Sequence, residues 1–334
     1  MTIAANMRAV LLTGHGGYDK LDFRDDVLVP SPGPNDVLIR VAAAGVNNTD
    51  INTRIGWYSK AVAEATDVGA ASGIAGAQDD GWSGAAFQFP RIQGADACGR
   101  IVAVGDNVNP ARIGERVLVE PVFRGASTFD ILYFGSEVDG GFADYTCVPS
   151  MHAHRVNSEL SDVELASFPC AYGTAENILT RIDLQAGERV LITGASGGVG
   201  CAAVQLAKRR GAEVTAMAAD AKAEIVRSLG ASRVVPRDAD LEALFGCEPD
   251  FPGDFAGGAV EVVFVAVVGH GQLHQHALGQ AAVQVDAHRV APGGAGHHAA
   301  SAREQVVARQ ARDGVDLVGQ EALNASGARH EQVQ

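Results

Sequence analysis

The sequence lacks the features of a membrane, secreted or nucleic-acid-binding protein. No apolar run approaches the length that a helix needs to cross a bilayer, and residues 1–10 hold no apolar signal-peptide core. Lys and Arg number 26 against 40 Asp and Glu, which gives a net charge of −14. A charge of this sign argues against partners such as nucleic acid or an anionic membrane.

Cysteine is also scarce. The five cysteines are widely spaced and no C-x-x-C occurs, which excludes a zinc ribbon and a disulfide framework of regular spacing. We therefore expect a reduced, cytoplasmic chain. Its 334 residues suffice for two domains, and its 47% hydrophobic and 20% charged residues are typical of a globular protein.

The first half of the chain is rich in short β-strand patterns. Apolar or alternating segments separated by Gly and Pro predict strands at Met7–Leu12, Val37–Val46, Ala97–Val104, Arg116–Val119 and Gly141–Val148. A long irregular insert occupies residues 60–90 and carries Trp82 and Phe87. It is either a surface loop or a lid over a substrate cleft.

The second half alternates between strand and helix patterns. Ser161 and Glu164 form a capping box, and the helical pattern of Leu165–Leu179 is broken at Pro169. The following segments predict a doubly wound parallel sheet: strands Arg189–Thr193, Glu213–Met217, Arg233–Val235 and Val260–Val268, with helices Gly200–Arg210, Ala221–Leu229 and a short one near Leu241–Phe245.

A glycine-rich turn joins the first of these strands to its helix. The turn Gly194–Gly200 follows an apolar strand and precedes an amphipathic helix, which is the setting of a dinucleotide-binding turn. Free N–H groups at the helix N-terminus suit a pyrophosphate. The alternative is an ordinary glycine-rich turn without a ligand.

Several motifs together resemble the medium-chain dehydrogenase/reductase superfamily and its zinc-free, quinone oxidoreductase-like branch. These motifs are Gly45–Asp50, Thr53–Tyr58, Gly94–Gly105, Gly114–Val117 and Ala186–Ile192, which lead into the glycine turn. The resemblance implies an α/β protein with a β-rich GroES-like catalytic domain at residues 1–157. A Rossmann NAD(P)-binding domain is expected at 158–265 and an atypical tail at 266–334.

The resemblance also implies that the chain binds no zinc. Zinc-dependent members have Cys where this chain has Asn47, and His-Glu where it has Ala95 and Asp96; only Cys170 keeps a ligand type. One thiolate, one amide and one alanine do not supply the convergent N and S donors of a catalytic zinc. Residues 120–140, where the family has its structural zinc lobe, contain no cysteine. A carboxylate site using Asp96 and Cys170 is the alternative.

Zinc-free relatives transfer hydride from NADPH to quinones or α,β-unsaturated carbonyls, and this chain is expected to do the same. We place Asn47 and Tyr58 at the substrate, where Tyr58 would protonate the enolate or simply pack as an aromatic ring. Asp50 is expected to fix its turn, and Cys170 to be a buried, inert thiol. The alternatives are a cofactor-binding but inactive or nucleotide-sensing protein, and a zinc alcohol dehydrogenase. A homodimer is a further expectation.

The cofactor is expected to be NADPH rather than NADH. NAD-dependent enzymes place an acid after the second strand, where this chain has Ala218 and Ala219. Asp220 could be a helix N-cap, and Lys222, with Arg233 and Arg237, could meet a 2′-phosphate or be solvated. The expected cofactor residues are Thr174, Gly194, Ala195, Ser196, Gly197, Gly198, Val199, Gly200 and Lys222.

The last 70 residues do not continue the family pattern. After Phe264 there is no Phe, Tyr, Trp, Ile or Lys, whereas seven of the ten histidines lie there. Three hypotheses account for this composition: a histidine-rich metal site, a disordered tail, or a change of reading frame near residues 258–268. We favour the frame change, which leaves open whether the protein is active.

Overall fold

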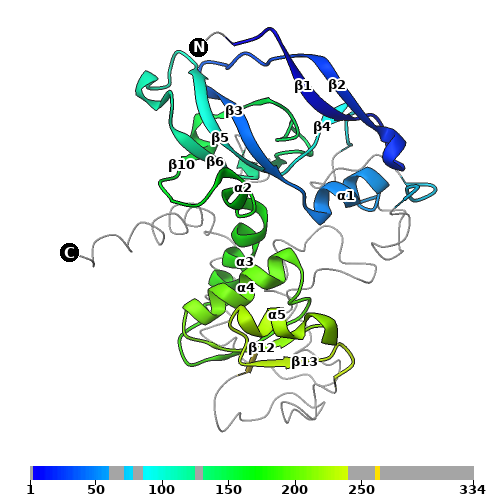
Figure 1. Cartoon of the computed structure of the whole chain (residues 1–334), viewed down its shortest axis with the longest axis vertical. Helices are drawn as coiled ribbons and strands as arrows, with labels where there is room; N and C mark the ends of the chain where they lie inside the picture. The colour runs from blue at the N-terminus through cyan, green and yellow to red at the C-terminus, as the bar shows by residue number, and fades with distance from the viewer. Residues whose placement is uncertain (1–2, 60–70, 78–85, 125–130, 240–259, 264–334) are drawn as a thin grey trace, which may run out of the picture. The chain divides into compact units, whose positions relative to one another are not determined.

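The computed structural model describes residues 3–59, 71–77, 86–124, 131–239 and 260–263 (Figure 1). These residues fall into two compact units, one up to Cys170 and one from Ala171 onward. The domain ranges expected from the sequence remain predictions. The tail, the expected helix near residues 241–245 and most of the insert at 60–90 lie outside the described residues. No helix in the described part is long and apolar enough to span a membrane.

The first unit is built mainly of antiparallel strands. Its strands are β1 (Asn6–Leu12), β2 (Leu21–Leu28), β3 (Asp36–Gly45), β4 (Arg91–Ile92), β5 (Asp96–Val104), β6 (Arg116–Val119), β7 (Val122–Arg124), β8 (Ile131–Tyr133), β9 (Tyr145–Pro149) and β10 (Ala153–Arg155). Its helices are α1 (Asn48–Ile55), α2 (Asp162–Leu165) and the start of α3 (Pro169–Arg181), with single 3-10 turns η1 (Tyr18–Lys20), η2 (Pro110–Arg112) and η3 (Ser150–His152).

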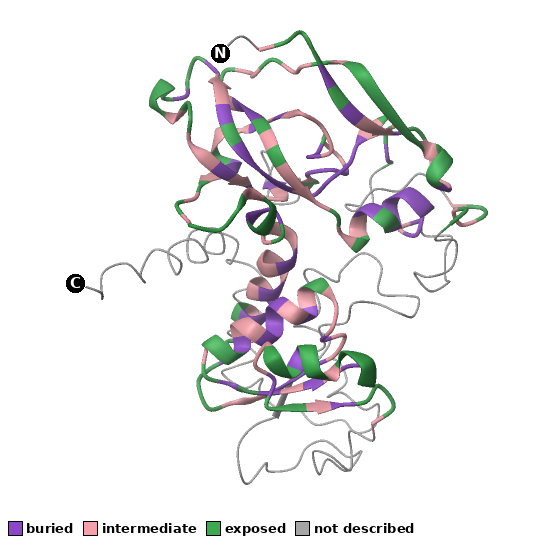
Figure 2. Ribbon diagram, viewed as in Figure 1, coloured by how far each residue is buried: buried purple, intermediate pink, exposed green. Residues whose placement is uncertain are grey.

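A five-stranded sheet with the order β10-β6-β5-β3-β9 forms the centre of this unit. Alternation along β6 and β9 buries every second residue, as the sequence pattern predicts. The inward side chains, among them Val37, Ile101 and Val117, belong to one buried apolar cluster that includes Phe134. Figure 2 shows buried stretches along these strands in purple. The sheet is therefore held by one apolar core, and the ends of β3 and β5 carry the candidate site.

The edge strand β2 is absent from the sequence-based prediction. Its sequence is half charged, and its residues are exposed apart from the half-buried Val27. Backbone pairing with β1 places it in a three-stranded sheet of order β2-β1-β4. A strand that is bound by main-chain hydrogen bonds rather than by buried side chains leaves no periodic pattern in the sequence.

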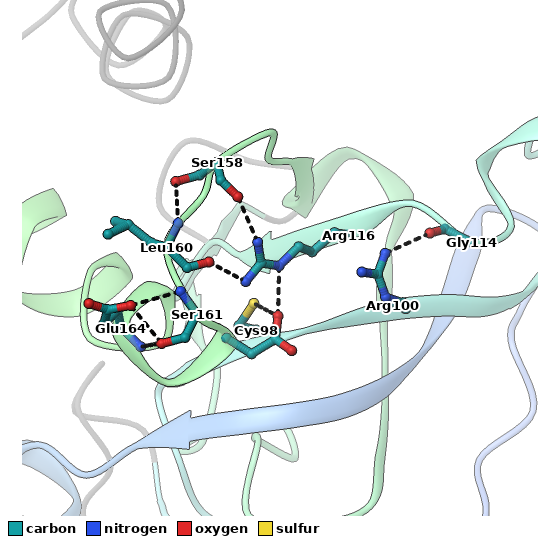
Figure 3. A network of polar contacts seen from close by, with 9 residues as sticks. Cys98, Arg100, Gly114, Arg116, Ser158, Leu160, Ser161 and Glu164 are labelled. Atoms are coloured by element: carbon teal, nitrogen blue, oxygen red, sulfur yellow. Dashed lines mark hydrogen bonds and ion pairs between the residues drawn. The ribbon is translucent and has the colours of Figure 1, made fainter.

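Helix α2 is fastened to the sheet by Arg116 (Figure 3). The Arg116 guanidinium donates to the Asp162 carboxylate at 2.6 Å and to the carbonyl oxygens of Ser158 at 3.0 Å and Leu160 at 2.6 Å. The capping box predicted at Ser161 and Glu164 is confirmed, since each side chain bonds the main chain of the other. One arginine thus fixes the segment that leads to α3.

Replacing Arg116 with Met is expected to lower the free energy of unfolding by about 1–3 kcal/mol, because three oxygen acceptors, two of them in partly buried hydrogen bonds, lose their donor. Arg24→Met is the control, since solvent screens the exposed Arg24–Asp26 pair and its loss should cost less stability than the loss of Arg116. Chemical denaturation of both variants measures the difference. Equal losses would contradict the role given to Arg116.

The second unit contains a four-stranded parallel sheet of order β13-β12-β11-β14. Its strands are β11 (Arg189–Ile192), β12 (Glu213–Met217), β13 (Arg233–Val235) and β14 (Val260–Val263). Its other elements are the rest of α3, α4 (Gly198–Arg209), η4 (Asp220–Lys222) and α5 (Ala223–Ser228). In order of sequence the strands lie 3-2-1-4, which is the strand order of a doubly wound dinucleotide-binding sheet.

Helices α3 and α4 pack together in this unit. Gln205 donates to the Tyr172 hydroxyl at 2.9 Å, and Arg210 donates to Glu176 at 2.6 Å and Thr180 at 2.9 Å. Pro169 is the first residue of α3, where its missing N–H costs nothing, so the predicted break at this residue is confirmed. These contacts hold α3 beside the helix that follows the glycine turn.

Candidate functional site

The first unit brings together Asn47, Asp96 and Cys170, the residues that stand at the metal-binding positions of the zinc-dependent members. The Asn47 side-chain nitrogen donates to Oδ2 of Asp96 at 2.9 Å, and the Cys170 backbone N–H donates to Oδ1 of the same carboxylate at 2.7 Å. Asp96 is the first residue of β5 and is 1% exposed, whereas Asn47 is half-buried and is the N-cap of α1, two residues after β3. One buried carboxylate therefore joins segments from three parts of the chain.

A second buried carboxylate shapes the main chain at the same place. Oδ2 of Asp50 accepts from the Asn47 backbone N–H at 2.8 Å, and its Oδ1 accepts from the Gly94 N–H at 3.1 Å. These hydrogen bonds confirm the structural role expected for Asp50, and the second one connects Asp50 to the turn before β5. The hydrogen bond between Asp50 and the Asn47 N–H also caps the start of helix α1. The polar sequence of this helix carries no helical signal, and its C-cap is Gly56 in the left-handed conformation.

Burial controls the ionisation of this cluster. It raises the pKa of Asp50 and of Asp96 to about 6, although hydrogen bonds to Asn47 act in the opposite direction. Burial likewise raises the pKa of the Cys170 thiol, and the nearby charges of Asp96 and Asp50 raise it further. A thiol with a raised pKa is a poor nucleophile, which supports the expectation of an inert Cys170.

Tyr58 lies close enough to this cluster for its charges to act on the phenol. Burial raises the pKa of Tyr58, a hydrogen bond with the Asn52 side chain lowers it, and charges at Cys170, Asp50 and Tyr133 raise it. The ring also packs edge-on against Trp57 with centroids 5.4 Å apart. Tyr58 is thus both a packed aromatic residue and a hydroxyl that bonds Asn52 within electrostatic range of Asp50.

Sequence reasoning missed two polar residues near Tyr58. Asn52 bonds the phenol from the middle of α1, and Tyr133 in β8 lies within electrostatic range of it. Neither position carries a motif, so no signal in a single sequence identifies them. Among the residues that the structure describes, no three His, Cys, Asp or Glu side chains converge in a way that would hold a metal ion.

The glycine turn in the second unit has the backbone geometry of a phosphate cradle. Gly194 adopts a left-handed φ of 59°, and its carbonyl oxygen accepts from the Gly197 N–H at 2.9 Å. A Cβ on Gly200 would collide with the Gly194 carbonyl oxygen and would lie 2.7 Å from the Ala195 Cα. The turn is therefore closed so tightly that only glycine fits at residue 200.

Ala195 occupies the position of the first glycine in the usual dinucleotide-binding pattern G-x-G-x-x-G, and the structure explains why an alanine fits there. Ala195 is fully buried and its N–H bonds the Met217 carbonyl oxygen at 3.2 Å, which fastens the turn to β12. The tight bend falls one residue earlier, at Gly194. Helix α4 starts at Gly198, two residues before the predicted start, and its N-cap Gly197 offers no side-chain acceptor. Ser196 and Val199 flank this end of the helix.

The end of β12 carries no acid at the expected position. Ala218 is 1% exposed and bonds the Val235 carbonyl oxygen at 3.1 Å, so the strand ends in a buried small residue. The interpretation of Asp220 as an N-cap is wrong: Ala219 is the N-cap of η4, and no side chain caps it. Asp220 instead occupies the first position of η4 and is exposed.

Lys222 lies near the first turn of α4. Its positive charge acts on the Cys201 thiol, lowering a pKa that burial raises. Arg237 follows β13 by two residues and so lies at the carboxyl edge of the parallel sheet, whereas Arg233 begins β13 opposite Thr215. Lys222 and Arg237 are therefore better placed than Arg233 for a group at this edge. Thr174 lies half-buried in α3, the helix that packs on α4.

Comparisons with known proteins agree with both units. The profile of the alcohol dehydrogenase GroES-like domain matches residues 33–158. The chain is 29% identical to the chloroplastic NADPH-dependent alkenal/one oxidoreductase of Arabidopsis thaliana over 236 residues, or 70% of this chain and 53% of that protein. It is 31% identical to the quinone oxidoreductase of Homo sapiens over 230 residues, or 68% of this chain and 58% of that protein.

A solved structure shows the same relationship. A protein of Sinorhizobium meliloti 1021, provisionally named an alcohol dehydrogenase, is 44% identical with a TM-score of 0.63, covering 72% of this chain and 66% of that one. The matched part spans just over half the length of the curated relatives. The fold and the site thus define a mixed α/β protein with a GroES-like domain and a dinucleotide-binding sheet. The chain belongs to the medium-chain dehydrogenase/reductase superfamily, in its quinone oxidoreductase-like branch.

Proposed function

We propose that this protein is an NADPH-dependent oxidoreductase that reduces a quinone, an enone or a related carbonyl compound without zinc. The observation that carries the proposal is the pairing of the Asn47 amide with the Asp96 carboxylate. An amide and a carboxylate that bond each other take the positions at which zinc-dependent members hold their metal ligands. The relatives named above are an alkenal/one reductase and a quinone oxidoreductase, which supports the same substrate class.

The residues of the second unit fit a nicotinamide dinucleotide. The closed turn at Gly194–Gly200 lets backbone approach a pyrophosphate, and the uncapped N–H groups at the start of α4 supply donors and a positive dipole end. Bound NADPH would supply the hydride. The protein's part is to hold the carbonyl compound and to stabilise the charge that develops on its oxygen.

Two side chains of the first unit are proposed to perform that part. Asn47 donates one amide hydrogen to Asp96 and has a second to offer to a substrate oxygen. Tyr58 carries a protonated phenol at neutral pH, and this hydroxyl is the group of the first unit that we assign to give a proton to the enolate or phenolate that hydride addition forms. We assign hydrogen bonding to Asn47 and proton donation to Tyr58.

The preference for NADPH is proposed to depend on Lys222, with Arg237 as a second cation. Lys222→Ala is expected to weaken NADPH binding about tenfold and to leave NADH binding unchanged, because only the 2′-phosphate of NADPH meets the ammonium group. Titration of both cofactors measures this. Lys208→Ala, a lysine in the last turn of α4, is the control. Tighter NADH than NADPH binding in the unsubstituted protein would overturn the assignment.

An assay with two readouts separates the proposal from its alternatives. NADPH oxidation is measured with a panel of quinones and enones, beside the thermal stabilisation that NADPH gives. Turnover with stabilisation supports the reductase, whereas stabilisation without turnover favours a cofactor-binding or impaired protein. Oxidation of an alcohol in a reaction that depends on one zinc bound per chain would favour the zinc alcohol dehydrogenase. The cytoplasmic location and the homodimer remain predictions.

A further inference from the structure

We propose that Asp96 is a positioning residue that sets the direction of the Asn47 side-chain amide toward the substrate. This inference rests on the proposed function, since it assigns Asn47 its donor role there. It assigns a role to Asp96, a buried acid, whereas the proposed reaction uses only Asn47 and Tyr58 of this unit directly. The two residues are 49 positions apart in the sequence, and β3 and β5 bring them together.

The two buried carboxylates bind different parts of Asn47. Asp50 binds main-chain N–H groups, at Asn47 and at Gly94, and so fixes where the backbone of residue 47 lies. Asp96 binds the side chain of Asn47 through Oδ2 and the Cys170 N–H through Oδ1. Oδ1 is thereby held by a main-chain donor, and Oδ2 is left as a fixed acceptor for one amide.

The chemistry of the two groups gives the pairing a direction. A primary amide has an accepting oxygen and a nitrogen with two hydrogens, whereas an ionised carboxylate only accepts. Asn47 must therefore turn its nitrogen, not its oxygen, toward Asp96. The second hydrogen on that nitrogen is then held in one orientation, and it is polarised because the first is bound to an anion.

The close packing around Asp96 keeps this arrangement rigid. Asp96 lies beside Gly45, where an added Cβ would be 3.0 Å from the Asp96 Cβ and 2.6 Å from the Ala166 carbonyl oxygen. Gly45 is paired with Asp96 in the register of β3 and β5. The Asp96 side chain is therefore packed closely against β3, and its two oxygens are held by the Asn47 amide and the Cys170 N–H.

The test uses Asp96→Asn, Asn47→Ala and the double variant in the full-length protein. Asp96→Asn keeps the shape but puts a donor or a neutral acceptor opposite the amide, so we expect kcat to fall about 10- to 100-fold with little change in KM for NADPH. The double variant is expected to be no slower than Asn47→Ala, because both changes remove one function. Asp144→Asn is the control, an acid of the same unit that pairs with Arg8 at the surface.

A purely structural role for Asp96 would give different results. Additive losses in the double variant, or an unchanged kcat in Asp96→Asn, would overturn the proposal. A second readout is independent of turnover: the side-chain NH₂ signal of Asn47 in a ¹⁵N–¹H spectrum, identified by its loss in Asn47→Ala, should shift in Asp96→Asn. An unshifted signal contradicts the pairing. Absence of turnover in the unsubstituted protein would instead count against the proposed function, and the spectrum would still decide the role of Asp96.

Discussion

Replacing Gly200 with Ala is expected to weaken NADPH binding by more than about 100-fold, which is about 2.7 kcal/mol or more. The added methyl group would meet the Gly194 carbonyl oxygen and the Ala195 Cα, so the turn must open. An opened turn moves the backbone N–H groups away from the pyrophosphate and pulls at the bond between Ala195 and β12. Titration of the cofactor by fluorescence, together with thermal unfolding, measures both effects.

Gly173→Ala is the matched control for this substitution. Gly173 lies in α3 of the same unit, and a Cβ there meets nothing within 4 Å. An alanine inside a helix should stabilise the protein by about 0.5–1 kcal/mol and leave NADPH binding unchanged. Binding of NADPH by Gly200→Ala as tight as by the control would show that the turn is not the cradle described above.

Replacing Tyr58 with Phe is expected to lower kcat about 100- to 1,000-fold, within the range of about 100- to 10,000-fold that a positioned proton donor contributes. The ring keeps its contact with Trp57, so the fold should be retained and KM for NADPH should change little. Steady-state kinetics with the best quinone or enone of the panel measures this. Tyr18→Phe is the control, because Tyr18 is 70% exposed and lies outside the site.

The two results for Tyr58 lead to different conclusions. A large fall in kcat with an unchanged melting temperature assigns the hydroxyl to proton transfer. Retention of kcat would make Tyr58 only a packed aromatic residue, the other interpretation of its sequence position. Asn47 would then be the remaining polar contact in the first unit for the substrate oxygen, and a solvent proton would complete the reaction.

Buried elements of this protein are the ones that its sequence predicts well. Strands β6, β12 and β13 have the predicted bounds because alternating or continuous apolar residues mark strands whose side chains enter a core. Strand β9 begins four residues after the predicted start, and the predicted strand at residues 260–268 is described only at 260–263. Elements that depend on main-chain contacts, such as β2 and α1, carry no such periodicity.

The candidate site shows the same division between local and long-range information. The glycine turn was predictable because seven consecutive residues contain it. The partners of Asn47 were not, because the Asp96 carboxylate reaches it across 49 positions and Cys170 reaches the same carboxylate across 74. Asp96 entered the sequence-based reasoning only as an alternative metal ligand, and no property of the sequence shows that its oxygens are occupied by N–H donors.

The central claim, that the protein reduces a carbonyl compound with NADPH and no zinc, is tested most directly by one experiment. The purified protein is dialysed against a strong zinc chelator, its metal content is measured, and its rate of NADPH oxidation is followed with a quinone or enone. We predict an unchanged rate at less than about 0.1 zinc per chain, since an amide paired with a carboxylate gives no zinc site. Loss of the rate on chelation and its return with one equivalent of zinc would contradict the account.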